Sequence, residues 1–323
     1  MSLRCKRIIS SLTPLTPLTP LSKKNRYTIH IPKSKMTSVS QVYRTPVLTD
    51  VSLRDGLQCL PKNMLGLFTT DKKEQVFRNQ IILNKHVENV EIGSIVSPNF
   101  YPVFSDSLKL YKRLDSYKHN SNQDARLFLL VPNFYGFQKG ICYGVNNFSF
   151  ITSVSESFQK NNTNRTIIEM KKEIQSCFKV LNDNNIPNYR TKIYISCISE
   201  CPLEGKINMD TIINEIIDYS IDYENTEICL SDTCGTLTIK DFQYIITQCL
   251  MMNQNINLEN ISLHLHVDYN NMNEVSEIIQ FCKRMNIHKF DVSLLDYGGC
   301  SKTISEEKTK PNMTYDLFYK LWE

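Results

Sequence analysis

The feature that most constrains the fold is a repeated alternation, from Val47 onward, of short β-rich runs with longer amphipathic runs. Eight short runs predict strands, at Val47–Val51, Val90–Ile95, Arg126–Val131, Asn147–Thr152, Lys192–Cys197, Glu227–Leu230, Ser262–His266 and Lys289–Ser293. Runs with helical periodicity lie between them, including Asp71–Lys85, Asn164–Leu181, Met209–Asp222, Ile239–Met252 and Met272–Met285. This order predicts an α/β fold, a (β/α)8 TIM barrel. A doubly wound sheet is less favoured because the sequence has neither GxGxxG nor GxxxxGK[ST].

Residues 1–45 differ in composition from the rest of the chain. They hold nine of the 37 basic residues, none of the 33 acidic residues, and a Leu-Thr-Pro repeat that ends at Pro20. We therefore expect a disordered tail over 1–45 and a barrel domain over 46–323. A basic, acid-free, Ser-containing tail is typical of a mitochondrial transit peptide. The alternative is a cytoplasmic protein, either because translation starts at Met36 or because the tail is not recognised.

Composition also narrows the classes of partner. Without the tail the chain is mildly acidic, which argues against a nucleic-acid partner. No run of about 18 apolar residues occurs, which argues against a membrane span. The eleven cysteines include no CxxC pair for zinc. We interpret ten of them as small apolar core residues in a reducing compartment, and Cys300 as the exception.

Candidate metal ligands follow the first predicted strand and lie on the seventh. Arg54 and Asp55 would stand at the barrel mouth, where a cation could stabilise an oxyanion and a carboxylate could bind a metal. His264 and His266 are two residues apart, so both imidazoles face one side of a strand. Asp55 with these histidines suits Mg²⁺ or Mn²⁺, and zinc stays open. The plainer interpretations are a surface salt bridge and a pair of packed histidines.

A third candidate follows the eighth predicted strand. Gly298 and Gly299 precede Cys300, and such a loop could bring a thiol over the barrel mouth. Taken alone, the three residues would more simply be a glycine turn with an incidental cysteine.

Together these motifs resemble the 3-hydroxy-3-methylglutaryl-CoA lyase family. Leu53-Arg54-Asp55-Gly56-Leu57-Gln58, His264-x-His266 and Gly298-Gly299-Cys300 stand in that family's order and strand positions. Five further stretches also look like the family's: Ser94–Pro98, Asn133–Phe137, Ser155–Asn162, Ser196–Lys206 and Ser231–Gly235. The resemblance extends from about Val47 to Phe318. It implies a metal-dependent carbon–carbon lyase that acts on an acyl-CoA substrate.

The resemblance also implies roles for individual residues. Asp55, His264 and His266 would hold the divalent cation, Mg²⁺ or Mn²⁺, with Asn312 as a fourth ligand. Arg54 would bind the substrate and stabilise the enolate formed by retro-Claisen cleavage. The remaining expected site residues are Cys300 and Asp232 for proton transfer, Glu91 for support, and Asn133 and Lys160 for contacts with the phosphates or pantetheine of the substrate.

Several positions depart from the family pattern and leave alternatives open. Asp296 and Tyr297 replace small residues before the glycines, Ser301 follows Cys300, and Asn312 lies twelve positions beyond Cys300. The chain then ends at Glu323, so we expect a barrel shortened at its C-terminal end. The alternatives are another enzyme of the same superfamily, such as a synthase or a hydroxy-oxo-acid aldolase, and a non-catalytic binding protein. A homodimer is also left open.

Overall fold

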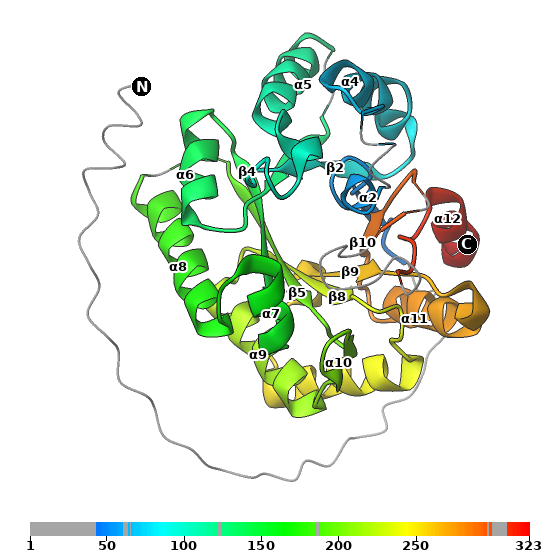
Figure 1. The fold of residues 1–323 in the computed structure, drawn as a ribbon. Helices are drawn as coiled ribbons and strands as arrows, with labels where there is room; N and C mark the ends of the chain where they lie inside the picture. The colour runs from blue at the N-terminus through cyan, green and yellow to red at the C-terminus, as the bar shows by residue number, and fades with distance from the viewer. Residues whose placement is uncertain are drawn as a thin grey trace.

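Eight parallel strands close into a barrel in the computed structural model (Figure 1). The structure describes residues 43–60, 64, 66–121, 124–184, 186, 188–295, 297–298 and 309–323. The strands follow one another around the barrel in the order β1-β10-β9-β8-β5-β4-β3-β2, with β1 hydrogen-bonded to both β2 and β10. They are β1 (Val47–Asp50), β2 (Val87–Ser94), β3 (Arg126–Leu130), β4 (Asn147–Ser153), β5 (Arg190–Ser196), β8 (Glu227–Asp232), β9 (Ile261–Leu265) and β10 (Lys289–Val292).

A helix follows each strand and packs outside the barrel (Figure 1). These helices are α4 (Thr70–Asn79), α5 (Ser107–Ser121), α6 (Phe134–Cys142), α8 (Ile167–Asp183), α9 (Met209–Asp222), α10 (Ile239–Met252), α11 (Met272–Arg284) and α12 (Tyr315–Trp322). Shorter elements lie in the loops: α2 (Asp55–Gln58), α7 (Glu156–Thr163), β6 (Glu200–Cys201) and β7 (Gly205–Lys206). The predicted (β/α)8 architecture is therefore confirmed.

Two predicted helices were wrong in their extent. The helix expected over Asn164–Leu181 begins three residues later, at Ile167, because Asn164 adopts left-handed backbone geometry and ends the preceding helix α7. Thr166 then starts α8 by forming a capping box with Glu169. The helix expected over Asp71–Lys85 stops at Asn79, and a 3₁₀ turn over Ile81–Leu83 follows it.

The C-terminal segment completes the barrel on the side of β9 and β10. The Pro311 carbonyl accepts the Val267 N–H at 2.7 Å, and the Met313 N–H donates to the Leu265 carbonyl at 3.2 Å. Helix α12 then packs Phe318 against Phe290 of β10, with ring centroids 5.0 Å apart. The Tyr315 hydroxyl donates to Asp50 at the end of β1 at 2.7 Å. These contacts secure α12 in the eighth helical position.

The prediction that ten cysteines are small apolar core residues is confirmed for six of the nine cysteines that the structure describes; Cys59 and Cys234 are half-buried, and Cys142 is exposed at the end of α6. Cys177, Cys197, Cys201, Cys229, Cys249 and Cys282 are free and buried. In the part of the chain described here, no helix is both long and apolar enough to cross a membrane. The tail over residues 1–42 lies outside the described residues.

Candidate metal centre and active site

Asp55, His264 and His266 come together at the C-terminal mouth of the barrel. Asp55 is the first residue of α2, directly after β1, while His264 lies on β9 and His266 follows it. The Nε2 atoms of the two histidines are 3.1 Å apart, and His264 Nε2 lies 3.8 Å from Asp55 Oδ2. Within the described residues, this is the group of three His, Cys, Asp or Glu side chains that could hold a metal ion. All three side chains are buried.

Hydrogen bonds on the far side of each ring determine which nitrogen faces the site. His264 Nδ1 lies 3.1 Å from the Asp291 carboxylate, and His266 Nδ1 lies 2.9 Å from the Lys310 carbonyl. Both partners are acceptors, so a neutral ring at either position would carry its proton on Nδ1 and turn an Nε2 lone pair toward the site. Burial, together with neighbouring His264, lowers the pKa of His266 to about 4. Two facing lone pairs are stabilised by a cation between them.

Asn312 brings a fourth donor set to this cluster. The backbone bonds around Pro311 and Met313 place it beside His266, and its Nδ2 donates to Asp55 Oδ2 at 3.0 Å and to the Tyr297 carbonyl at 2.8 Å. Its Oδ1 is buried and has no hydrogen-bond partner. Buried amide oxygens are normally paired, so this one is available to a ligand.

Arg54 lies beside the cluster and is held from several directions. Its Nε donates to Glu91 Oε2 at 2.6 Å, and its Nη1 is paired with Asp55. Glu91, on β2, also accepts the Ser149 hydroxyl. The guanidinium lies over the Tyr194 ring, 5.0 Å from its centroid. Burial disfavours the charge of Arg54, but the carboxylates of Glu91 and Asp55 outweigh it and raise its pKa well above the usual value.

The buried charges at the mouth leave a negative excess. Four buried carboxyl groups, those of Asp55, Glu91, Asp232 and Asp291, stand against two cations, those of Arg54 and Lys192. Burial would raise the pKa of Asp291, but Lys192 and His264 lower it to about 2, so it is ionised. A divalent cation would offset the excess charge, and both Nε2 atoms and the unpaired Asn312 oxygen could hold it. The residues present therefore fit a divalent metal ion.

Other predicted site residues lie at or near the mouth with different partners. Asp232 ends β8, and its carboxylate accepts the N–H groups of Thr236 and Leu237; burial raises its pKa to about 6. Asn133 caps helix α6 by accepting the Gly136 N–H at 2.8 Å. Lys160 is exposed on α7, 3.6 Å from Glu156. Cys300, with Gly299, lies outside the described residues.

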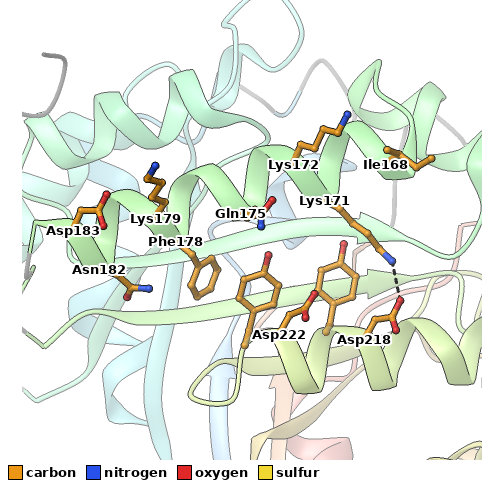
Figure 2. Close-up of a pocket in the computed structure, with 12 residues that line it drawn as sticks. Ile168, Lys171, Lys172, Gln175, Phe178, Lys179, Asn182, Asp183, Asp218 and Asp222 are labelled. Carbon is orange, nitrogen blue, oxygen red and sulfur yellow. Dashed lines mark hydrogen bonds and ion pairs between the residues drawn. The ribbon is translucent and has the colours of Figure 1, made fainter. Parts of the chain in front are cut away.

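A small cavity of about 50 Å³ lies over the cluster and is lined by Arg54, Asp55, Gln58, Ile151, Phe158, Asn162, Tyr194, Ser196, Ser231, Thr233, His264 and His266. A larger groove of about 630 Å³ lies elsewhere, between α8 and α9 (Figure 2). Phe178 and Tyr219 line that groove, and Lys171 and Asp218 pair across it. It lies on the outer wall of the barrel and contains none of the metal-cluster residues. The candidate site is therefore the smaller, chemically richer cavity.

Sequence reasoning missed three residues that contact the site from below. Lys192 and Tyr194 lie on β5 and Asp291 on β10, and all three are at most 3% exposed. A signal was present, because charged residues inside otherwise apolar predicted strands must find buried partners. The spacing of Lys192 and Tyr194 also places both on the interior face of β5.

These observations define a class: a (β/α)8 barrel with a buried Asp–His–His group suited to a divalent cation. Comparison with known proteins gives the family. A model of the HMGL-like family matches residues 45–272, and the chain belongs to that family.

The chain is 26% identical over 293 residues to the cytoplasmic 3-hydroxy-3-methylglutaryl-CoA lyase of Homo sapiens, covering 91% of this chain and 72% of that protein. It is 26% identical over 253 residues to the mitochondrial hydroxymethylglutaryl-CoA lyase of Arabidopsis thaliana, covering 78% of this chain but only half of the Arabidopsis protein. An HMG-CoA lyase from Acinetobacter baumannii, solved with coenzyme A and 3-methylmalate, has the same fold: its TM-score is 0.70 at 23% identity, over 87% of this chain and 84% of that one.

Proposed function

We propose that this protein cleaves 3-hydroxy-3-methylglutaryl-CoA into acetoacetate and acetyl-CoA. The observation that carries the proposal is the buried Asp55–His264–His266 cluster with the Arg54 guanidinium beside it. Membership of the HMGL-like family and the names of the distant relatives support this choice of reaction. The coenzyme A bound to the bacterial neighbour supports an acyl-CoA as the substrate.

The proposed metal site consists of Asp55 Oδ, both histidine Nε2 atoms and Asn312 Oδ1. A divalent cation bound there supplies Lewis acidity, which lowers the pKa of a coordinated hydroxyl group. The cavity above the cluster is small, about 50 Å³, so the coenzyme A portion of the substrate would lie on the rim. Asn133, the N-cap of α6 after β3, and Lys160, in the last turn of α7 after β4, are the proposed rim contacts.

The bond that breaks joins the carbinol carbon to the carbon next to the thioester. The tertiary hydroxyl group loses its proton and becomes the ketone of acetoacetate, while the bonding electrons form the enolate of acetyl-CoA. Arg54 is placed to stabilise that enolate oxygen, because Glu91 and Tyr194 fix its position before substrate binds. Cys300 and Asp232 are proposed for the proton transfer: Asp232 carries away the hydroxyl proton or orients a neighbouring group, and Cys300 acts as the base for that proton or as the acid that protonates the enolate carbon.

The test is acetoacetate release from 3-hydroxy-3-methylglutaryl-CoA by the full chain with Mg²⁺ or Mn²⁺ and a thiol reductant. We expect Arg54→Gln to lower kcat by about 100-fold to 1000-fold while Mn²⁺ binding persists, because a stabilising charge is lost and no proposed ligand is removed. Cys300→Ala and a chelator should also largely abolish release. Arg126→Gln, at an exposed pair with Glu88, is the matched arginine control and should retain activity.

The two remaining alternatives give different results in the same experiment. Release of products only from hydroxy or oxo acids lacking coenzyme A would identify another enzyme of the superfamily. A folded protein that binds neither Mg²⁺ nor Mn²⁺ and turns over none of these substrates would be a non-catalytic binding protein. The basic composition of residues 1–45 supports mitochondrial import as the proposed location.

A further inference from the structure

A row of buried polar side chains crosses the barrel beneath the Asp55–His264–His266 cluster. Lys192 and Tyr194 lie on β5, and Asp291 lies on β10, which β8 and β9 separate from β5 around the barrel. The Lys192 ammonium is paired with Asp291 Oδ1, and the Tyr194 hydroxyl donates to Asp291 Oδ2 at 2.8 Å. The same Oδ2 lies 3.1 Å from His264 Nδ1. This series of contacts therefore ends at His264, a candidate metal ligand.

In this arrangement Asp291 acts only as a hydrogen-bond acceptor toward the His264 imidazole. Lys192 and Tyr194 are donors, so they hold Asp291 in place as an acceptor. An acceptor beside His264 Nδ1 requires a proton on that nitrogen, which leaves the Nε2 lone pair facing Asp55 and His266. Burial strengthens this preference, because a buried carboxylate oxygen facing an unprotonated nitrogen would have no compensation from water.

We propose that Asp291, held by Lys192 and Tyr194, is the positioning residue that fixes His264 as its Nδ1–H tautomer and so makes Nε2 the metal-binding atom. The inference rests on the metal site of the proposed function. It adds that the affinity for the ion depends on Lys192 and Tyr194 of β5, a strand that β8 separates from the strand of His264. Tyr194 also contacts Arg54, because the Arg54 guanidinium lies over the Tyr194 ring.

The most informative variant is Asp291→Asn. An asparagine has one oxygen, and the Lys192 ammonium is the strongest donor available to it. The amide N–H group would then face His264 Nδ1 and favour a proton on Nε2, the atom needed for the ion. We expect the Kd for Mn²⁺ to rise about 10-fold to 100-fold, the usual effect of losing the outer partner of a ligating histidine.

Glu227→Gln is the matched control. Glu227 Oε1 also pairs with Lys192, at 3.0 Å, but Glu227 lies at the start of β8 and is not a partner of His264. This variant removes a carboxylate from the same buried lysine, so it should leave the Mn²⁺ affinity within about threefold of the wild type. A similar loss in both variants would attribute the effect to general damage around Lys192 and overturn the proposal.

The tautomer can be observed directly, without turnover. Two-bond ¹H–¹⁵N correlation spectra of the metal-free, ¹⁵N-histidine-labelled full chain should show His264 as Nδ1–H, with the signal assigned by its loss in His264→Gln. Asp291→Asn should shift His264 toward Nε2–H. An Nε2–H form in the wild type overturns the proposal even if the variant does not fold. Because neither measurement uses the substrate, a protein with no lyase activity could still confirm this inference, and an active lyase could still refute it.

Discussion

Gly298 shows how a single atom can decide whether a side chain reaches the proposed metal site. A Cβ at this position would lie 2.5 Å from Asn312 Nδ2 and 2.6 Å from its Cγ, closer than packed atoms allow. The side chain of Asn312 therefore occupies the space that only glycine leaves open. Packing against Asn312 therefore explains why a glycine stands at position 298, the first glycine of the Gly298-Gly299-Cys300 motif.

The prediction at this scale is that Gly298→Ala weakens metal binding about tenfold or more, because it displaces a proposed ligand rather than the protein backbone. Isothermal titration with Mn²⁺ measures the change. Gly66→Ala is the control, since a Cβ there meets nothing within 4 Å, and it should bind Mn²⁺ as the wild type does. Equal affinity in the two variants would remove Asn312 from the ligand set.

At the scale of elements, β1 and α12 are joined through a buried carboxylate. Asp50 accepts the Ser52 N–H at 2.9 Å, the Ser52 hydroxyl at 2.8 Å and the Tyr315 hydroxyl at 2.7 Å. Burial raises the pKa of Asp50 from 3.8 to about 7, although these hydrogen bonds lower it in part. The carboxyl group that joins the first strand to the last helix is therefore sensitive to pH.

The direction of the pH effect follows from proton binding. Between pH 4 and pH 7 the folded chain keeps a proton on Asp50 that the unfolded chain has lost, so this group's contribution to stability is present below pH 4 and is lost as the pH rises through 7. The slope is at most about 1.4 kcal/mol per pH unit. Urea unfolding in the presence of a chelator measures this effect. The free energy of unfolding of Asp50→Asn should rise relative to that of the wild type from pH 5 to pH 8. A constant difference between Asp50→Asn and the wild type over this range would contradict the assigned pKa.

Much of the element pattern could be predicted from sequence because burial in a parallel barrel leaves a strong local signal. All eight predicted strands coincide with barrel strands, and Met209–Asp222 and Ile239–Met252 match α9 and α10 at both ends. The errors arose where local backbone geometry decided the outcome. Left-handed Asn164 ends one helix and Thr166 begins the next, and neither residue interrupts the amphipathic pattern.

The site was only partly predictable, for a reason that applies to the whole molecule. Asp55, His264 and His266 could be predicted as a group. The alternation of side chains along a strand and the order of the strands place all three at the same end of the barrel. Lys192 and Asp291 are 99 positions apart, and nothing in either strand alone specifies that they pair across the barrel. The wide spacing between Cys300 and Asn312 argued against Asn312 as a metal ligand, but backbone hydrogen bonds to the end of β9 bring it to the cluster. Closure of the barrel, rather than sequence separation, determines these neighbours.

The proposed chemistry of the whole molecule depends on an ion held at the mouth of the barrel. Crystals of the full chain grown with Mn²⁺ and measured for anomalous scattering test that most directly. We predict a strong anomalous peak within roughly 2.5 Å of an Asp55 carboxylate oxygen, His264 Nε2 and His266 Nε2, with Asn312 turning its Oδ1 toward the peak. A peak bound through His264 Nδ1, or no peak among these residues in a crystal that holds Mn²⁺ elsewhere, would contradict the account.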